Sequence, residues 1–366
     1  MPRASGLCGV LALVVGCGPP LARPGHGPGD GEKDPEAPAP IVTTERGSHG
    51  GHLVFVAENG ARVGELTGSA QTLVQDITPA TSPDGRWVVF ASSRSRAHFA
   101  ETSLWIVAAH PGATPQRLTT SGGADRNPAW ITPDTIVFAS SRAGTFDLYR
   151  ARLVRAGGRF ALAAPPSPLT RAATHELSPA VAPGGGTIVY AAVDAHNTST
   201  LWLIPAAGGT PRKLTNGPAD LSPAFFPDGR HIAFAAPAAG RKDTDIYVID
   251  ADGGGRRLLL DEPLGDETGP VLAAGGRFLF ATSVYRSVAS GRPVLSSVVV
   301  VDLATKPRVF RALHDPVAVD SRIGVALLPG TLDGAQLAGN ATYREALLAA
   351  VVENIRREID RAQPDR

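Results

Sequence analysis

The sequence contains little cysteine, and its two copies, Cys8 and Cys17, both lie near the start. The rest of the chain therefore has no disulfide and no cysteine-based zinc site. Basic residues are not concentrated either, because the formal net charge is +1 and no long run of one sign occurs. A nucleic-acid binder normally carries a clustered basic surface. The composition thus excludes nucleic acid from the partners that we expect.

Catalytic motifs are absent as well. The sequence has no G-x-S-x-G nucleophile elbow, no Walker-type phosphate loop and no H-E-x-x-H zinc motif. The run Asp250-Ala251-Asp252-Gly253 resembles the start of a calcium loop, but it lacks the other ligands, including the terminal Glu. We interpret that run as a hairpin turn. We therefore predict a protein that is not an enzyme and needs no cofactor.

The apolar run near the N-terminus, from Leu7 to Val15, has only nine residues. It is too short to span a bilayer as a helix, and with Arg3 before it the run is typical of a signal peptide. The end of the run, Leu13-Val14-Val15-Gly16-Cys17, resembles a bacterial lipobox, which implies a lipid on Cys17. An ordinary secretory signal with an incidental cysteine is the alternative. We predict a signal peptide over residues 1–16 and a lipid-anchored periplasmic protein.

Residues 17–52 have the composition of a linker. The 35 positions after Cys17 contain seven prolines and eight glycines, and such a stretch buries too little apolar surface to offset the entropy lost on ordering. We predict a disordered tether. Gly18 in place of an aspartate favours the outer membrane, by resemblance to the sorting rule of enteric bacteria. His49 and His52 could bind a metal, but a solvated linker explains them as well.

From residue 53 onward the chain repeats. A proline that follows a small or polar residue and precedes Ala or Val recurs at intervals of 49, 51, 44, 47 and 46 residues: Thr78-Pro79, Asn127-Pro128, Ser178-Pro179, Ser222-Pro223, Gly269-Pro270 and Asp315-Pro316. Within one unit, strand patterns end at Pro227 and cover 232–235, 245–249 and 256–259, with Asp-Gly turns between them. A fixed period of this length marks an array of similar units.

Aromatic residues recur in the same strands of these units. Predicted second strands carry Phe55, Phe90, Phe138, Tyr190, Phe234 and Phe280, and third strands carry Trp105, Tyr149, Trp202 and Tyr247. A lone four-stranded sheet exposes two apolar faces, whereas a closed ring of sheets buries both. We interpret the aromatics as core between sheets rather than as a base-stacking platform. The predicted fold is all-β, a six-bladed β-propeller of four-stranded antiparallel blades over residues 53–330.

Four segments of the repeat units share a recognisable pattern: Ser82-Pro83-Asp84-Gly85-Arg86, Phe226-Pro227-Asp228-Gly229-Arg230, Asp245-Ile246-Tyr247-Val248 and Asp250-Ala251-Asp252-Gly253-Gly254. These segments resemble the motifs of TolB-type propellers. The resemblance covers roughly residues 53–320 and implies the TolB-like propeller fold. The family's separate N-terminal α/β domain has no match in this sequence. The resemblance therefore does not carry a role in the Tol–Pal system with it.

The first repeat unit lacks an innermost strand. Residues 53–75 show three strand patterns, 53–57, 62–66 and 72–75. We expect Asp315–Val319 to supply the missing strand and so join the two chain ends. The pattern at Arg322–Leu328 is an alternative for that place.

After residue 330 the pattern becomes helical. Thr342-Tyr343-Arg344-Glu345 fits a capping box, and an apolar stripe follows at Leu348, Val352, Ile355 and Ile359. We predict a C-terminal helical extension over residues 331–366. The helix either packs on the side of the propeller or binds a partner.

One carboxylate stands three positions before the repeat proline in five units: Asp76, Asp125, Glu176, Asp220 and Glu267. These positions lie at the entry to the innermost strand, so the side chains are expected to ring one mouth of the central channel. There they could bind a cation or a basic peptide. The alternative is that each acid caps backbone N–H groups of its own loop. Arg126, His175 and His314 lie beside the series and complete the candidate binding residues.

These observations predict a non-catalytic binding module of the cell envelope. Its propeller mouth is expected to bind an envelope protein or peptide, and its lipid is expected to hold it to the membrane. The alternative is a metal-dependent enzyme that acts, like a lyase, on envelope or extracellular polysaccharide, because some related propellers are lyases. That function requires histidines and carboxylates clustered at the mouth.

Overall fold

A computed structural model describes residues 41–47, 50–56, 62–68, 74–94, 96, 101–237, 243–261, 265–273, 276–286, 293–304, 310–312, 317–318 and 322–327. These residues form 26 β-strands in five hydrogen-bonded sheets. Within these ranges, no helix is long and apolar enough to cross a bilayer. The predicted signal peptide, Cys17 and the predicted C-terminal helix of residues 331–366 lie outside the described residues.

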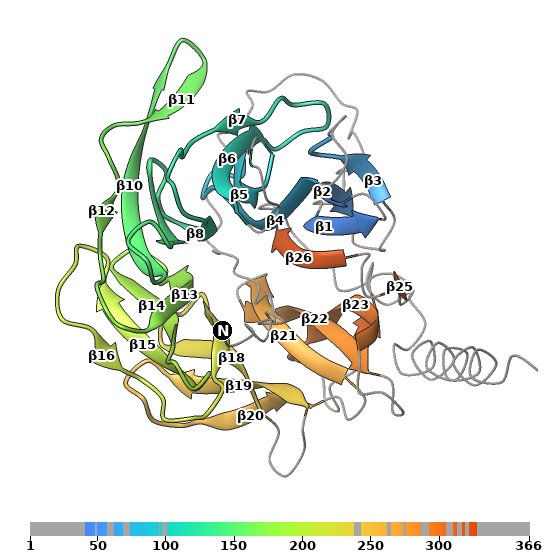
Figure 1. The fold of residues 1–366 in the computed structure, drawn as a ribbon. Helices are drawn as coiled ribbons and strands as arrows, with labels where there is room; N and C mark the ends of the chain where they lie inside the picture. Colours follow the sequence, from blue (N-terminus) through green and yellow to red (C-terminus); the bar gives the residue numbers. More distant parts are fainter. Residues whose placement is uncertain are drawn as a thin grey trace, which may run out of the picture.

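The first sheet has eight strands (Figure 1). Its order is β26 (Arg322–Leu327), β1 (Ile41–Gly47), β2 (Gly50–Val56), β4 (Val74–Thr81), β5 (Trp87–Ser92), β6 (Ser103–Ala108) and β7 (Gln116–Arg117), with β3 (Arg62–Glu65) on β2. Its two halves are joined by a parallel pairing of β2 with β4 at only two positions, Gly50 and Gly51. Glycine at both positions lets the two backbones come this close.

The other four sheets are antiparallel and follow one another along the chain. The second contains β8 (Asp125–Thr132), β9 (Thr135–Ser140) and β10 (Asp147–Ala156), with β11 (Arg159–Leu162) and β12 (Ser167–Pro168) on β10. The third contains β13 (His175–Val181), β14 (Thr187–Val193), β15 (Ser199–Pro205) and β16 (Arg212–Lys213). The fourth contains β17 (Leu221–Phe225), β18 (His231–Pro237), β19 (Thr244–Asp250) and β20 (Arg257–Leu260). The fifth contains β21 (Gly265–Ala273), β22 (Phe278–Arg286) and β23 (Pro293–Asp302), with β24 (Phe310–Ala312) and β25 (Val317–Ala318) on β23.

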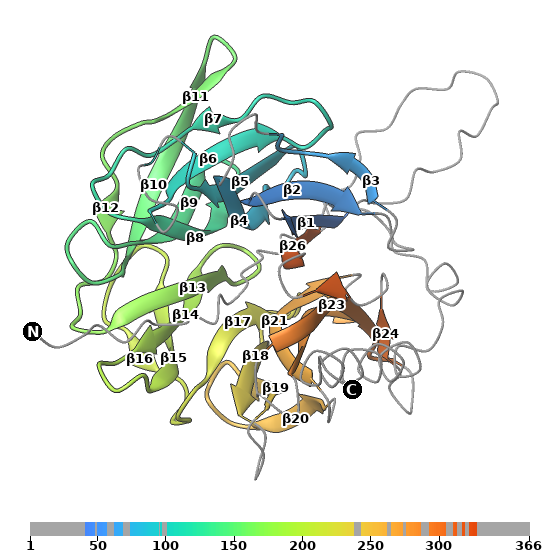
Figure 2. The ribbon, with the colours of Figure 1, turned by 45° about the vertical axis from the view of Figure 1, so that its right-hand side comes forward.

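The sheets surround a common centre, as the two views in Figures 1 and 2 show. The innermost strands lie side by side in the order β4, β8, β13, β17, β21 and β26, and β26 also lies against β4. The all-β propeller is thus confirmed. The number of blades is not, because the described strands form five sheets and not six.

The strand that joins the two chain ends differs from the preferred prediction. β26 pairs with β1, so the alternative at Arg322–Leu328 supplies the innermost strand of the first sheet. Within Asp315–Val319, β25 is short and pairs with β23 of the fifth sheet instead. The physical reason lies in the sequence: residues 323, 325 and 327 are apolar and alternate with other residues over six positions, whereas β25 offers two positions.

The propeller also begins earlier than residue 53. β1 lies inside the predicted tether, and Val42 is fully buried in a cluster that also contains Leu53 and Phe280. All seven prolines of the predicted tether lie at or before Pro40. The composition of the whole stretch therefore indicated a linker, although the β-branched residues that follow Pro40 favour a strand. The predicted strand at 53–57 corresponds to β2, which comes third in the order β26, β1, β2. The predicted strand at 72–75 overlaps the start of β4.

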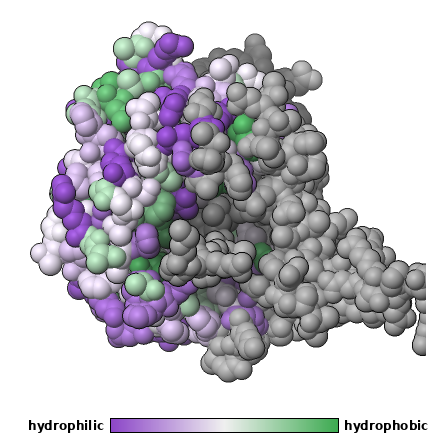
Figure 3. All heavy atoms as spheres, viewed as in Figure 1, coloured by the Kyte–Doolittle hydropathy of each residue, from purple (hydrophilic) through white to green (hydrophobic). Residues whose placement is uncertain are grey.

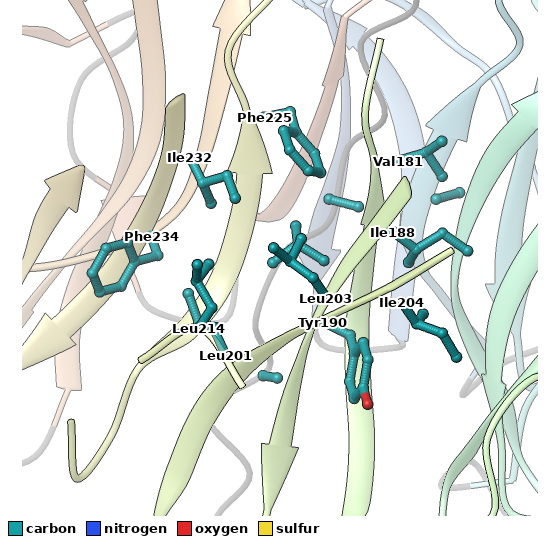
Figure 4. Close-up of a cluster of buried hydrophobic side chains, with 14 of the residues drawn as sticks. Val181, Ile188, Tyr190, Leu201, Leu203, Ile204, Leu214, Phe225, Ile232 and Phe234 are labelled. Carbon is teal, nitrogen blue, oxygen red and sulfur yellow. The ribbon is translucent and has the colours of Figure 1, made fainter. Parts of the chain in front are cut away.

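Apolar side chains fill the space between neighbouring sheets. Tyr190 and Phe234 belong to one buried cluster of the second, third and fourth sheets, part of which Figure 4 shows. Phe138 lies between the first and second sheets, and Phe90 and Phe280 belong to the cluster that joins the first sheet to the fifth. These five rings have at most 2% of their surface exposed. The interpretation of the aromatics as core is therefore confirmed for the second-strand rings, whereas the third-strand residues Trp105, Trp202 and Tyr247 are only partly buried.

Candidate functional site

A bulge recurs at the repeat proline of every sheet. The residue before the proline has a left-handed backbone, with φ of 49° at Thr78, 50° at Asn127, 54° at Ser178, 51° at Ser222 and 60° at Gly269. The strand register shifts at the same positions. A non-glycine residue with positive φ before a proline is strained, so packing must hold it. The bulge fixes how the preceding residues of the innermost strand, including the carboxylate, enter the sheet.

All five carboxylates of the predicted series are buried, with at most 3% of each residue exposed. Asp76, Asp125 and Glu267 are paired in register with Ser92, Ser140 and Ser283 on the second strand, while Glu176 is paired with Ala192. Asp220 precedes β17 and bonds to the backbone N–H of Gly217 in its own loop. The side chains thus lie within the packed sheets rather than in open solvent at a channel mouth. This placement favours structural roles for most of them.

The carboxylates of the first and second sheets have matching sets of donors. Asp76 accepts hydrogen bonds from the hydroxyls of Thr67 at 2.6 Å and Ser92 at 2.5 Å, and it pairs with Arg94. Asp125 accepts from the hydroxyls of Ser121 at 2.9 Å and Ser140 at 2.5 Å, and its Oδ1 lies 3.0 Å from Nη2 of Arg142. Two hydroxyls and one guanidinium therefore satisfy each buried charge.

The same arginines also lie over aromatic rings. Arg94 lies 5.7 Å from the ring centroid of Phe90 and 5.4 Å from that of Trp105. Arg142 lies 5.5 Å from Phe138 and 4.6 Å from Tyr149. Each ring pair comes from the second and third strands, and it attracts the cation through its negative π face.

The fourth sheet builds the same arrangement with an arginine from another connection. Arg256, between β19 and β20, lies 3.2 Å from Oδ1 of Asp220 and over Phe234 and Tyr247 at 5.1 and 4.9 Å. We call this combination of carboxylate, arginine and aromatic pair the arginine clasp. The described residues form it in the first, second and fourth sheets.

The third sheet has an incomplete clasp. Glu176 and the paired rings of Tyr190 and Trp202 are present, but no arginine or lysine among the described residues forms an ion pair with Glu176. Its Oε2 is buried and has no hydrogen-bond partner there. Burial raises the pKa of Glu176 to about 7, and the neighbouring Asp147 adds to this effect, while the Thr170 hydroxyl opposes it.

In the fifth sheet, Glu267 is fully buried and accepts a hydrogen bond from the Ser283 hydroxyl at 2.7 Å. The paired residues at the place of the aromatic pair are Ala281 and Val299. Phe280 is one position out of phase with the aromatics of the other sheets, because it pairs across to Val300 and Val271. The fifth sheet therefore keeps the acid and the serine but not the aromatic pair.

Two further predicted site residues lie together at the junction of the second and third sheets. The Arg126 guanidinium lies 4.5 Å from the ring centroid of Phe146, and the His175 ring lies 6.0 Å from the same centroid. The Phe146 N–H donates to Nδ1 of His175 at 3.2 Å, and the Glu176 N–H donates to the Phe146 carbonyl at 2.7 Å. We call Arg126, Phe146 and His175 the Phe146 patch. His314 lies outside the described residues.

Phe146 was not identified from the sequence. It precedes β10 in a short connection after Arg142, and only its apolar character within a polar loop could have marked it. His175 is exposed, and Arg126 and Phe146 are partly buried. The patch therefore presents one cation, one ring and one imidazole at the same end of the sheets as the second-to-third-strand loops. Loops held by a rigid scaffold are frequent binding sites.

The described surface favours recognition of polar groups. The large apolar residues exposed on it are Val154 and Leu258, and hydrophilic and neutral residues predominate on the coloured part of the face in Figure 3. Within the described ranges, no group of three or more His, Cys, Asp or Glu side chains could hold a metal ion. The Phe146 patch and the adjacent Glu176 are therefore the candidate site.

No family model matches the chain. Among curated proteins, the chain is similar to the Tol-Pal system protein TolB of Francisella tularensis subsp. tularensis and of subsp. mediasiatica. In both cases it is 26% identical over 225 residues, which cover 58% of this chain and 49% of the relative. The chain thus matches about half the length of these relatives.

Solved structures show the same fold at lower identity. TolB from Acinetobacter baumannii aligns with a TM-score of 0.61 and 15% identity over 80% of this chain and 67% of that one. A TolB homologue from Agrobacterium tumefaciens aligns with a TM-score of 0.55 and 15% identity over 78% and 90% of the two chains. The chain therefore has a TolB-like β-propeller fold.

Proposed function

We propose that this protein is a non-catalytic binding scaffold of the bacterial cell envelope, and that it binds a protein or peptide at the mouth of its propeller. The Phe146 patch carries the proposal. Arginine and aromatic side chains are enriched among the few residues that dominate the binding energy of protein interfaces, and here a guanidinium lies against a ring beside an exposed histidine. Similarity to the Tol-Pal system protein TolB supports a protein as the partner.

The sequence and the same similarity support a location in the cell envelope. We propose a periplasmic protein that is held to the outer membrane by lipid on Cys17. We also propose six blades, because each half of the eight-stranded first sheet has its own innermost strand, β26 or β4. In this account the first half is the blade that joins the two ends of the chain.

The alternative function is a metal-dependent lyase that acts on polysaccharide. Such an enzyme needs metal ligands clustered at the mouth, and the described residues supply no such cluster. Of the histidines first considered, His175 accepts a hydrogen bond from the Phe146 N–H within the Phe146 patch and does not belong to a group of potential metal ligands in the described structure. Protein binding is therefore the better supported function.

Site-specific photo-crosslinking tests the proposal. A photoreactive amino acid is placed at Ala143, an exposed position in the connection before β10, near the Phe146 patch. A matched probe at Arg230 occupies an exposed turn between β17 and β18, at the opposite end of the strands. We expect one discrete protein adduct from envelopes at Ala143 that is absent at Arg230 and reduced in Phe146→Ala. Equal adducts at both probes, or none at Ala143, would refute binding at this mouth.

A further inference from the structure

The third sheet retains two of the three parts of the arginine clasp. Residues paired directly across antiparallel strands share one face of the sheet, as do residues two apart on one strand. Tyr190 is paired with Trp202, and Glu176 is paired with Ala192, two positions beyond Tyr190. Glu176 and both rings therefore lie on one face. Asp125, Phe138 and Tyr149 hold the same positions in the second sheet.

The missing part is the cation. Ala192 stands where the second sheet has Ser140, and Asp194 stands where it has Arg142. Asp194 is held in its own turn, where it accepts from the N–H groups of His196 at 2.8 Å and Thr198 at 2.9 Å. In the fourth sheet, Arg256 stands two positions before Leu258, which is paired with Tyr247. The equivalent position in the third sheet, two before the Lys213 that is paired with Trp202, is Pro211. Both routes that bring an arginine into other clasps are thus closed here.

The groups that face Glu176 leave it short of positive charge. Asp147 from β10 adds a second carboxyl, and Tyr190 from β14 stays neutral because burial raises its pKa. Lys213 of β16 is paired with Trp202, but its side chain is exposed and forms no ion pair with Glu176 in the described structure. The cation of the neighbouring Phe146 patch, Arg126, lies against the Phe146 ring.

A guanidinium fits this set of groups better than an ammonium does. Its planar face stacks on aromatic rings, and its fork of N–H groups donates two parallel hydrogen bonds to one carboxylate. In all three sheets with a complete clasp, the cation is an arginine. The buried Oε2 of Glu176, which lacks a donor among the described residues, is the acceptor that such a group would satisfy.

We propose that the incomplete clasp of the third sheet is a receptor for an arginine side chain of the protein partner, with Glu176 as its carboxylate and Tyr190 and Trp202 as its aromatic wall. This inference rests on the proposed function, because a protein supplies the arginine. It adds the chemistry of recognition: the partner completes a structural motif that the scaffold completes for itself elsewhere. The Phe146 patch adjoins this receptor through the Glu176 N–H.

A proton competes with the arginine for Glu176. The pKa of Glu176, about 7, means that the carboxyl is mostly neutral in mild acid and mostly charged in mild alkali. The receptor is therefore expected to bind a guanidinium at about pH 8 and to lose roughly tenfold or more in affinity at about pH 5.5. Asp147 is a second acidic side chain beside Glu176, so it also favours a cation at this place.

The test titrates the full chain with L-argininamide and follows the indole NMR signal of Trp202, which Trp202→Phe identifies among the four tryptophans. L-citrullinamide, which has the same shape but a neutral urea in place of the guanidinium, is the ligand control. We expect saturable binding of L-argininamide at about pH 8 that is lost in Glu176→Gln. The double variant Ala192→Ser/Asp194→Arg rebuilds the clasp of the second sheet, so it should exclude the probe and raise the melting temperature.

A second variant keeps the result interpretable. Arg142→Ala opens the complete clasp of the second sheet, so it should gain a second site for L-argininamide, and the probe should recover part of the lost stability. No binding by the wild type, equal binding of L-citrullinamide, or binding that survives in the Ala192→Ser/Asp194→Arg variant would overturn the inference.

The photo-crosslink at Ala143 separates this inference from the proposed function. If the partner adduct forms in the wild type and is lost in Ala192→Ser/Asp194→Arg, both stand. If the adduct persists undiminished in the double variant, the scaffold function stands and the arginine receptor is wrong. If the wild type forms no adduct but binds L-argininamide through Glu176, the receptor stands and the proposed mouth is wrong.

Discussion

The second and third sheets share one frame but differ in how each treats its buried carboxyl. Both have the bulge before the repeat proline, an acid on the innermost strand and a paired set of rings. Asp125 forms an ion pair with Arg142 and accepts hydrogen bonds from two hydroxyls, whereas Glu176 has no cation among the described residues. The comparison teaches that these two sheets share their backbone and their paired rings, while the polar groups around the buried acid differ. Function is therefore expected where this set of polar groups is incomplete.

Removing a buried aromatic ring, a feature that the sheets share, should have the largest effect on the unfolding free energy. Phe138→Ala in the second sheet and Phe234→Ala in the fourth each remove a ring that is fully buried. We expect each variant to lose roughly 3–5 kcal/mol of unfolding free energy in urea titrations, the usual cost of deleting a buried aromatic. A loss under about 1 kcal/mol at both positions would contradict the placement of these rings in the core.

The ion pair that the third sheet lacks can be removed from the second sheet. Arg142→Ala leaves Asp125 buried without its cation, so we expect a loss of about 3 kcal/mol in denaturant unfolding. The control is Arg152→Ala, which breaks the exposed ion pair with Asp134 on the same sheet, where both side chains are about half exposed or more. That change should cost under about 1 kcal/mol. Equal losses in the two variants would show that the clasp contributes no more than a surface pair.

The third sheet should be the junction that responds to pH. The pKa of Glu176 in the folded chain, about 7, lies above its ordinary value of 4.5. Between these pH values the folded state holds more protons than the unfolded state does. The unfolding free energy therefore falls as pH rises from about 4.5 to 7, by at most about 3 kcal/mol, and then levels off. Glu176→Gln should flatten this fall in urea titrations; a variant with the same slope as the wild type would assign the titration to another group.

The bulge should give the smallest effect, and the same effect in both sheets. Asn127→Gly and Ser178→Gly place glycine at positions with left-handed φ, as Gly269 already does in the fifth sheet. Glycine relieves the strain of positive φ but loses more backbone entropy on folding. We expect the unfolding free energy, measured by thermal denaturation, to change by less than about 1 kcal/mol in either variant. Valine at either position should lower it by more than that. A large loss with glycine would mean that the side chain, not the backbone, holds the bulge.

The sequence was sufficient to predict the propeller because period and turn chemistry are local. The repeat prolines mark the innermost strands, and the Asp-Gly turns at Asp84 and Asp228 form as expected, with each aspartate accepting from the backbone two residues on. The ends of the ring were harder. Ring closure depends on which of two short strands packs better against β1. β1 itself was not predicted, because it follows a proline-rich stretch whose composition is that of a linker.

The candidate site was only partly predictable, for a different reason. The acidic positions are visible in the sequence, but their burial and their arginine partners depend on loops that differ between sheets. Arg142 follows the second strand, whereas Arg256 comes from the connection before the fourth strand. Phe146 carries no repeated pattern at all. The incomplete clasp of the third sheet therefore becomes apparent only when the sheets are compared in three dimensions.

The most direct test of this account is infrared spectroscopy of the carboxyl groups of the full chain. A protonated carboxylic acid absorbs apart from a carboxylate, so the method counts neutral acids at each pH. We expect a buried protonated carboxyl in mild acid that titrates near pH 7 and is absent in Glu176→Gln, while Asp125→Asn leaves it unchanged. A chain with no such carboxyl, or one whose signal persists in Glu176→Gln, would contradict the central claim that the third sheet holds an acid without its cation.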